Sequence, residues 1–431
     1  LDEVAALVEW PVAITGYFEA RFLELPPEVI VATVETNQRY FTVFEDAGQT
    51  RLTSAFITVI NIESRDVTQV VAGNERVVRP RLSDAAFFFD QDRAIALDVH
   101  AQGLARITFQ QALGTVADKQ ARIATLAAAL ARDTGASDQR VADVQRAAAL
   151  CKADLVTKMV FEFPELQGLM GGDYARRSGA PESVWRAIRE HYLPTQQGTP
   201  IPSTAEGQMV ALADKLDSLA GIFAIGQKPT ASKDPYALRR AALGVLRILI
   251  EGDWSLDLGQ ALQLALDAQP AGDRSPKTRA ELLDFILERL RAYRVGATVD
   301  GRAITPEAFE AVRTLGGTRP LDLEHRLQAV HQFVVLPAAP HLAAANKRIR
   351  NVLRQAAERD GHAPDGKVDP QRLTHTSEQA LWTTVEALEQ RKGDTDYAER
   401  LLDLANLRDP VDDFFEAVMV NDDDAAIRQN R

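Results

Sequence analysis

The chain has 431 residues, of which 46% are hydrophobic and 26% are charged, and its formal net charge is −12. This length exceeds what one hydrophobic core supports, so several domains are expected. The negative net charge excludes a protein that binds nucleic acid over its whole surface, because such a surface would be basic. Charged residues or prolines interrupt every apolar run well before about 18 residues, which excludes a transmembrane helix. The single cysteine, Cys151, excludes an internal disulfide framework and a cysteine-based zinc site. With no signal-peptide pattern at the start, we expect a cytoplasmic location.

β-Strand patterns are confined to the first part of the chain, residues 1–115. Three β-branched and aromatic runs predict antiparallel strands, at residues 29–34, 40–44 and 56–60. A helix is expected over residues 76–93, with Ser83 as a candidate cap.

From residue 116 onward the apolar spacing predicts helices almost throughout. They are expected near residues 116–133, 138–160, 181–192, 205–225, 235–252, 256–268, 277–293, 306–315, 321–334, 340–359, 370–391, 396–407 and 411–420. Pro- and Gly-containing stretches at 270–276 and 294–305 are candidate linkers. We therefore predict a mainly α, multidomain fold: a β-containing region (1–115), a helical domain (116–252), a helical linker (253–304) and a C-terminal helical domain (305–431).

The helix expected at 340–359 carries the strongest nucleic-acid signal. Its apolar residues fall on one narrow face, and Lys347, Arg350 and Arg354 lie nearly opposite, with Asn346 and Arg348 beside them. Residues 342–359 contain five Lys or Arg and one Glu in an otherwise acidic chain. Guanidinium groups at one-turn spacing suit phosphates or a stacked base. The alternative is an ordinary solvated helix face.

A helix, a loop and a second helix are expected between residues 213 and 249. Asp234 is expected to cap the second helix, with Pro235 at its first position. Lys233, Arg239 and Arg240 form a second candidate contact for RNA or another subunit.

Residues 147–217 have the outline of an HD-type domain, a superfamily whose His and Asp residues hold a catalytic metal. Asp154, His191 and Asp214 could remain from the set of metal ligands of that superfamily. Cys151 and Lys152, however, occupy the place where its His-Asp pair would be. Because a lysine repels a cation and convergent histidines are missing, we expect no metal here.

Several blocks of sequence resemble the β subunit of the bacterial heterotetrameric glycyl-tRNA synthetase. They are Arg79-Pro80-Arg81-Leu82-Ser83-Asp84-Ala85, Ala213-Asp214-Lys215-Leu216-Asp217, Gln227-Lys228-Pro229-Thr230-Ala231-Ser232-Lys233-Asp234-Pro235-Tyr236-Ala237-Leu238-Arg239-Arg240 and Ala344-Ala345-Asn346-Lys347-Arg348-Ile349-Arg350-Asn351-Val352-Leu353. Ala231 and Tyr236 replace the usual Gly and Phe. By this resemblance the chain is a fragment lacking the N-terminal part and the last few residues.

The resemblance implies an α₂β₂ enzyme in which the α subunit holds the active site, with ATP and Mg expected there and no cofactor in this chain. The β subunit would bind glycine tRNA through a C-terminal anticodon-binding domain, and its HD-like domain would be degenerate. The implied tRNA contacts are Lys347, Arg350, Arg354, Arg348, Asn346 and Arg326. Two alternatives are an HD-type phosphohydrolase acting on nucleotides or RNA, and a non-enzymatic helical scaffold.

Overall fold

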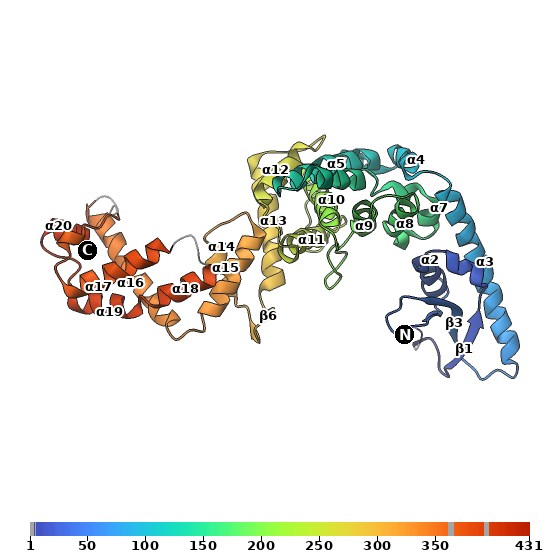
Figure 1. Ribbon diagram of the computed structural model, residues 1–431, viewed down its shortest axis with the longest axis horizontal. Coiled ribbons are helices and arrows are strands. Elements are labelled where there is room, and N and C mark those ends of the chain that lie inside the picture. The colour runs from blue at the N-terminus through green and yellow to red at the C-terminus, as the bar shows by residue number, and fades with distance from the viewer. Residues whose placement is uncertain (1–3, 5, 361–365, 392–395) are drawn as a thin grey trace. The chain divides into compact units, whose positions relative to one another are not determined.

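A computed structural model describes residue 4 and residues 6–360, 366–391 and 396–431 (Figure 1). The chain divides into two compact units, Leu1–Arg289 and Leu290–Arg431, and the boundary falls within helix α13 (Pro276–Arg294). The predicted class is confirmed at the level of a mainly helical protein with a small antiparallel sheet near the N-terminus. The finer division into four parts stays a prediction.

The N-terminal sheet has three antiparallel strands in the order β1 (Val12–Tyr17), β3 (Leu52–Ile60), β2 (Phe41–Phe44). Val12 pairs with Ile60, and Phe41 pairs with Ile57. The strands predicted at 40–44 and 56–60 are therefore confirmed, whereas β1 was not predicted. At Gly16 a side chain is excluded, because a Cβ there would lie 2.5 Å from the Phe56 ring.

The strand predicted at residues 29–34 is wrong. The segment forms helix α2 (Pro27–Val31), which continues into a short π-helical turn, η2 (Ala32–Thr36). Pro27 stands at the start of the helix, where its missing N–H costs nothing. Val29, Ile30, Ala32, Thr33 and Val34 are all buried, so burial does not alternate along the segment as it does in a half-exposed strand.

Helix α3 (Val67–Arg93) packs against β1 and is longer than predicted. The Asp66 side chain caps it by accepting the backbone N–H of Gln69 at 3.1 Å. The proposed cap at Ser83 is wrong, because this residue lies inside the helix and donates its hydroxyl to the Arg79 carbonyl.

The remaining helices of the first unit follow α3 along the chain, and several of them pack around α10 (Figure 1). Their bounds are α4 (Leu97–Gln102), α5 (Val116–Asp133), α6 (Asp138–Ala148), α7 (Lys158–Glu162), α8 (Leu169–Arg177), α9 (Glu182–Glu190), α10 (Ala205–Ala224), α11 (Leu238–Glu251) and α12 (Leu258–Asp267). Helix α10 packs against α5, α6, α9, α11 and α12 and is buried along most of its length, which fits a helix whose apolar residues lie all around it. Helix α5 begins at a capping box, in which Thr115 and Asp118 each accept the other's backbone N–H.

Short 3₁₀ turns connect several of these helices. They are η1 (Ala20–Glu24), η3 (Gly103–Arg106), η4 (Ala153–Val156) and η5 (Pro164–Leu166), and a two-stranded ribbon, β4 (Thr108–Gln110) with β5 (Gly114–Thr115), precedes α5. The single helix predicted over 138–160 is wrong, because α6 ends at Ala148 and η4 and α7 follow it. Helix α8 was not predicted.

The second unit consists of helices and one small ribbon. Its elements are β6 (Thr298–Val299), β7 (Arg302–Ala303), α14 (Pro306–Arg313), α15 (Pro320–Phe333), α16 (Ala339–Asp360), η6 (Pro370–Arg372), α17 (Thr376–Gln390), α18 (Tyr397–Ala405), α19 (Arg408–Ala417) and α20 (Ala425–Asn430). Helix α15 packs against α14 and α18, and α19 packs against α16 and α17. The helices predicted at 306–315, 321–334, 340–359, 396–407 and 411–420 are confirmed to within about three residues. The helix predicted at 370–391 begins only at Thr376, because the 3₁₀ turn η6 precedes it, and α20 was not predicted.

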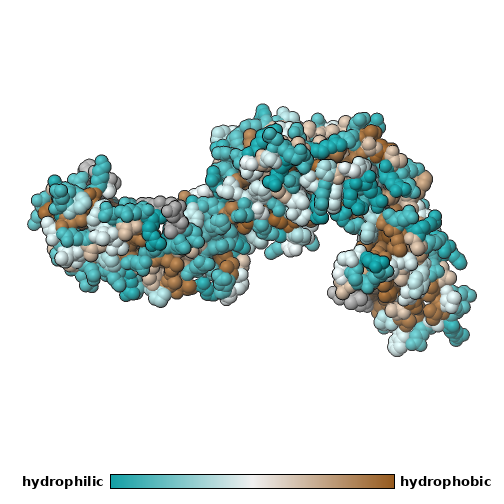
Figure 2. Space-filling model, viewed as in Figure 1, coloured by the Kyte–Doolittle hydropathy of each residue, from teal (hydrophilic) through white to brown (hydrophobic). Residues whose placement is uncertain are grey.

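Apolar side chains are exposed beside the N-terminal sheet, including Leu7, Trp10 and Ile62, and apolar surface is visible over that region in Figure 2. Across the described part of the chain, no helix is both long and apolar enough to cross a membrane.

Candidate nucleic-acid interface

The basic helix predicted near the C-terminus is α16. The five side chains predicted to contact RNA on this helix are exposed: Asn346, Lys347, Arg348, Arg350 and Arg354. We refer to Lys347, Arg350 and Arg354 as the α16 stripe. Since the whole chain carries a net charge of −12, the stripe is a local basic surface on an acidic protein.

The cations of α16 differ in how free they are to bind an anion. Lys347 and Arg350 form no side-chain hydrogen bond or ion pair with any residue that the structure describes. Arg354 forms an exposed ion pair with Glu358 at 3.0 Å. The guanidinium of Arg348 lies 4.0 Å from the ring centre of Phe415. Lys347 and Arg350 are therefore the cations that can take a phosphate without losing a contact.

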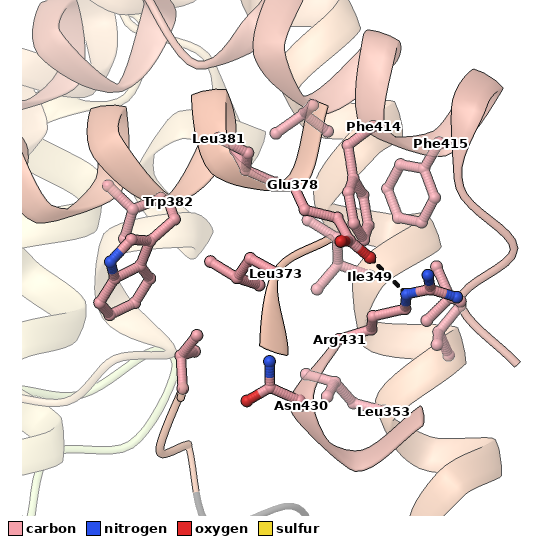
Figure 3. Close-up of a pocket in the computed structure, with 15 residues that line it drawn as sticks. Ile349, Leu353, Leu373, Glu378, Leu381, Trp382, Phe414, Phe415, Asn430 and Arg431 are labelled. Atoms are coloured by element: carbon pink, nitrogen blue, oxygen red, sulfur yellow. Dashed lines mark hydrogen bonds and ion pairs between the residues drawn. The ribbon is translucent and has the colours of Figure 1, made fainter. Parts of the chain in front are cut away.

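The opposite side of α16 faces an apolar pocket of about 260 Å³ (Figure 3). Ile349 and Leu353 of α16 point toward Leu373, Trp382 of α17 and Phe414 of α19 across this pocket. The ion pair between Glu378 and Arg431 lies at its edge. Because the apolar side of α16 faces this pocket in the interior of the unit, its basic side faces solvent.

Arg326, the remaining predicted tRNA contact, is engaged within the protein. Its Nη2 lies 2.8 Å from Asp322 Oδ2, and its Nε donates to the Tyr397 hydroxyl at 3.3 Å. The hydrogen bond to Tyr397 and the charge of Asp322 raise the pKa of this guanidinium. Arg326 thus helps to join α15 to α18, and its contact with RNA stays a prediction.

The second candidate contact lies between α10 and α11, in the first unit. Lys233 and Arg240 are exposed, whereas Arg239 donates to the Thr230 carbonyl and lies 3.8 Å from Asp234. The helix start predicted at Pro235 is wrong, because α11 begins at Leu238.

Helix α11 starts later than predicted because Ala237 has a left-handed conformation, with φ of 53°. This residue separates the turn at Asp234 from the helix. Asp234 nevertheless caps α11 from a distance. Its two carboxylate oxygens accept the backbone N–H groups of Leu238 and Arg239. The carboxylate therefore occupies the helix start, where an RNA phosphate would otherwise be favoured.

The three residues predicted to remain from an HD motif, Asp154, His191 and Asp214, are buried in the first unit. Asp154 Oδ2 accepts the backbone N–H groups of Gly168 and Gly171 at 2.6 and 2.9 Å, and burial raises the pKa of Asp154 to about 6. A Cβ at Gly171 would lie 3.1 Å from this carboxylate, so the glycine permits the close approach. His191 Nδ1 lies 2.6 Å from the Ile188 carbonyl oxygen, and burial holds the pKa of His191 well below its usual value.

Asp214 is bound by ammonium groups. Lys152 Nζ lies 2.7 Å from Asp214 Oδ2, and Lys119 Nζ lies 3.0 Å from Oδ1. Burial by itself would raise the pKa of Asp214, but the charges of Lys119 and Lys152 hold it well below its usual value. Lys152 also lies 3.8 Å from the ring centre of Tyr192.

These contacts do not fit a metal centre. In residues 6–360, 366–391 and 396–431, no three His, Cys, Asp or Glu side chains are grouped so that they could hold a metal ion. The ammonium group of Lys152 forms an ion pair with the Asp214 carboxylate, which is the group that a metal ion would need as a ligand.

The sequence analysis missed the continuation of this buried charge cluster. Asp217 lies 2.7 Å from Arg122 and 3.1 Å from Lys119, and its Oδ1 also accepts the side-chain amide of Gln269 at 3.0 Å. One signal was available, since Asp214, Lys215 and Asp217 lie in a helix whose other residues are mostly apolar. Charges on such a helix must be buried and therefore paired.

Comparison with known proteins identifies the class to which this chain belongs. A family model described as "Glycyl-tRNA synthetase beta subunit" matches residues 1–312. The chain is a member of that family, a class of aminoacyl-tRNA synthetase subunits.

Individual relatives agree with the family match. The chain is 48% identical to the glycine--tRNA ligase beta subunit of Ectopseudomonas mendocina (strain ymp) and 47% identical to that of Pseudomonas putida (strain KT2440), in each case over 100% of this chain and 62% of the relative. It is also 47% identical to the same subunit of Chromohalobacter salexigens, over 61% of the relative. The chain thus spans about three-fifths of the length of these curated relatives.

Proposed function

We propose that this chain is the part of a glycine–tRNA ligase β subunit that binds glycine tRNA and positions it for ATP-dependent glycylation in an α subunit. The observation that carries the proposal is the exposed α16 stripe, with Lys347 and Arg350 free of partners among the described residues. An acidic protein that binds RNA needs such a local basic surface, and the family supplies the identity of the RNA.

In this proposal the chain contributes binding energy and orientation rather than chemical groups. Lys347 and Arg350 bind backbone phosphates of the anticodon arm, and Arg354 joins them when its exposed pair with Glu358 opens. The unit 290–431 serves as the anticodon-binding domain, and Lys233 and Arg240 provide a second contact for RNA or the α subunit. Holding the tRNA in one orientation lowers the entropic cost of the reaction at its distant end.

Catalysis and assembly are assigned to the larger enzyme. ATP and Mg bind to the α subunit, and two copies of each subunit form an α₂β₂ heterotetramer in the cytoplasm. Residues 116–252 form a degenerate HD-like domain in which buried ion pairs replace a metal centre, which is supported by the contact of Lys152 with Asp214. The phosphohydrolase and scaffold alternatives receive no support from the relatives.

A binding titration tests the proposal. Filter binding of the chain to a glycine tRNA transcript, and to a transcript with an altered anticodon, is measured at two salt concentrations. We expect tighter, salt-dependent binding to the unaltered transcript, because phosphate contacts release counterions and anticodon contacts select the loop. Equal affinity for both transcripts, or no binding, would contradict a tRNA-recognition role for this part of the subunit.

A further inference from the structure

A polar groove lies between α15 and α18 in the second unit. Its cavity volume is about 490 Å³, within the range of roughly 300–1,000 Å³ typical of small-molecule sites. Helix α15 contributes His325, Gln328, Ala329 and Gln332, and α18 contributes Tyr397, Ala398 and Arg400. Asp396, the cap of α18, also lines the cavity, and its carboxylate accepts the backbone N–H of Glu399 at 2.8 Å. We call this cavity the α15–α18 groove; the polar side chains that it offers to a ligand are His325, Gln328, Gln332 and Arg400.

The wall of this groove is held by hydrogen bonds. The Tyr397 hydroxyl donates to Asp322 Oδ1 at 2.6 Å and accepts from Arg326 Nε at 3.3 Å. Arg326 in turn pairs with Asp322, so three side chains join the start of α18 to α15. The groove is therefore formed before any ligand arrives, which lowers the cost of binding.

The polar groups of the groove are largely free. His325, Gln332 and Arg400 make no side-chain hydrogen bond or ion pair with the residues placed by the structure, and Gln328 donates one amide hydrogen to Glu324 at 2.7 Å. Gln328 and Gln332 follow His325 by three and seven positions, so all three lie on one face of α15. Buried residues such as Leu323 and Leu327 occupy the opposite face.

This set of groups matches one nucleotide. Glutamine amides offer a donor and an acceptor to a base edge, the imidazole offers either, and the guanidinium suits a phosphate. An unstacked nucleotide of an RNA loop exposes the Watson–Crick edge of its base as well as its phosphate, whereas pairing hides that edge. The groove also lies near the proposed RNA surface, since α18 packs against both α15 and α16.

We infer that the α15–α18 groove binds one unstacked nucleotide of the RNA held by the α16 stripe, with Arg400 at the phosphate and Gln328 and Gln332 at the base edge. The inference rests on the proposed function. It adds a site that distinguishes single nucleotides, whereas the stripe senses only backbone charge.

The test uses the full chain with Gln332→Ala or Arg400→Ala. Both residues are exposed, so these variants should remain folded, and a urea titration confirms this. Each is titrated with the glycine tRNA transcript and with transcripts that lack one loop base at a time. Gln260→Ala and Arg132→Ala, at exposed positions on α12 and α5, are the matched controls.

We expect Gln332→Ala to weaken binding of the intact transcript about tenfold, the effect of losing one or two hydrogen bonds to a base. For one abasic transcript the variant and the wild type should bind equally, because the base that Gln332 contacts is already gone. Arg400→Ala should weaken binding of every transcript, since the phosphate remains.

Equal losses from Gln332→Ala on every transcript, or no loss at all, would overturn the inference. If Lys347→Ala with Arg350→Ala still weakens binding in that case, the proposed function stands without the groove. If the stripe variant also binds normally, the proposed function fails together with the inference.

Discussion

Removing the two free cations of the α16 stripe is the most direct test of where RNA binds. In the variant Lys347→Ala/Arg350→Ala, two phosphate contacts would be lost. Each contact contributes about 0.7–0.9 to the slope of log K against log salt, so the slope should become shallower by about 1.5. Each charged hydrogen bond contributes about 1.5 kcal/mol, so affinity at low salt should fall roughly a hundredfold.

The assay is filter binding of a glycine tRNA transcript between about 50 and 200 mM salt. Arg408→Ala is the matched control, because Arg408 is exposed on α19 in the same unit and lies outside the stripe. The fold should be unaffected, since Lys347 and Arg350 are exposed and form no side-chain hydrogen bond or ion pair with the described residues. An unchanged slope, or an equal change in the Arg408 variant, would refute the assignment of phosphate contacts to α16.

Three further predictions follow from the contacts of single residues. Glu358→Ala should tighten tRNA binding a few-fold in the same assay, because it frees Arg354 and removes a negative charge from the stripe; unchanged or weaker binding would contradict this. Lys152→Met should lower the free energy of unfolding by about 3 kcal/mol in urea titrations, since Asp214 loses a buried partner at 2.7 Å; a loss under about 1 kcal/mol would show that the pair is dispensable. Because burial raises the pKa of Asp154 to about 6, its ionisation destabilises the fold, and the stability of the wild type relative to Asp154→Asn should fall by up to about 3 kcal/mol as the pH rises from 4 to 7; a parallel pH dependence in both proteins would exclude this.

Local signals predicted some elements well. Helix α5 is found where it was predicted because its start is set by neighbouring residues, Thr115 and Asp118, which cap each other. Helix α10 (Ala205–Ala224) is found where a helix was predicted at 205–225, because most of its residues are apolar and no proline interrupts them. The strand predicted at 29–34 is wrong because β-branched residues favour strands only weakly, and packing of this segment in the folded protein overrides that preference.

Elements set by contacts distant in sequence could not be predicted. The break after α6 places Lys152 against Asp214, 62 residues later. Lys119 and Asp217 are 98 residues apart and meet only because α5 and α10 pack together. The α16 stripe was visible in the sequence because the spacing of residues on one helix determines it. The α15–α18 groove was not, because its two sides are brought together by Asp322, Arg326 and Tyr397.

An acidic protein can use its overall charge to make RNA binding selective. With a net charge of −12, the protein as a whole repels the phosphate backbone, and an RNA that misses the proposed contact residues gains nothing that offsets this repulsion. Repulsion of wrongly placed RNA separates correct from incorrect complexes as effectively as added attraction does. Neutralising exposed acidic residues far from α16 should therefore raise the affinity for any RNA while reducing the preference for glycine tRNA. This effect should disappear at about 1 M salt, where charges more than about 3 Å apart are screened.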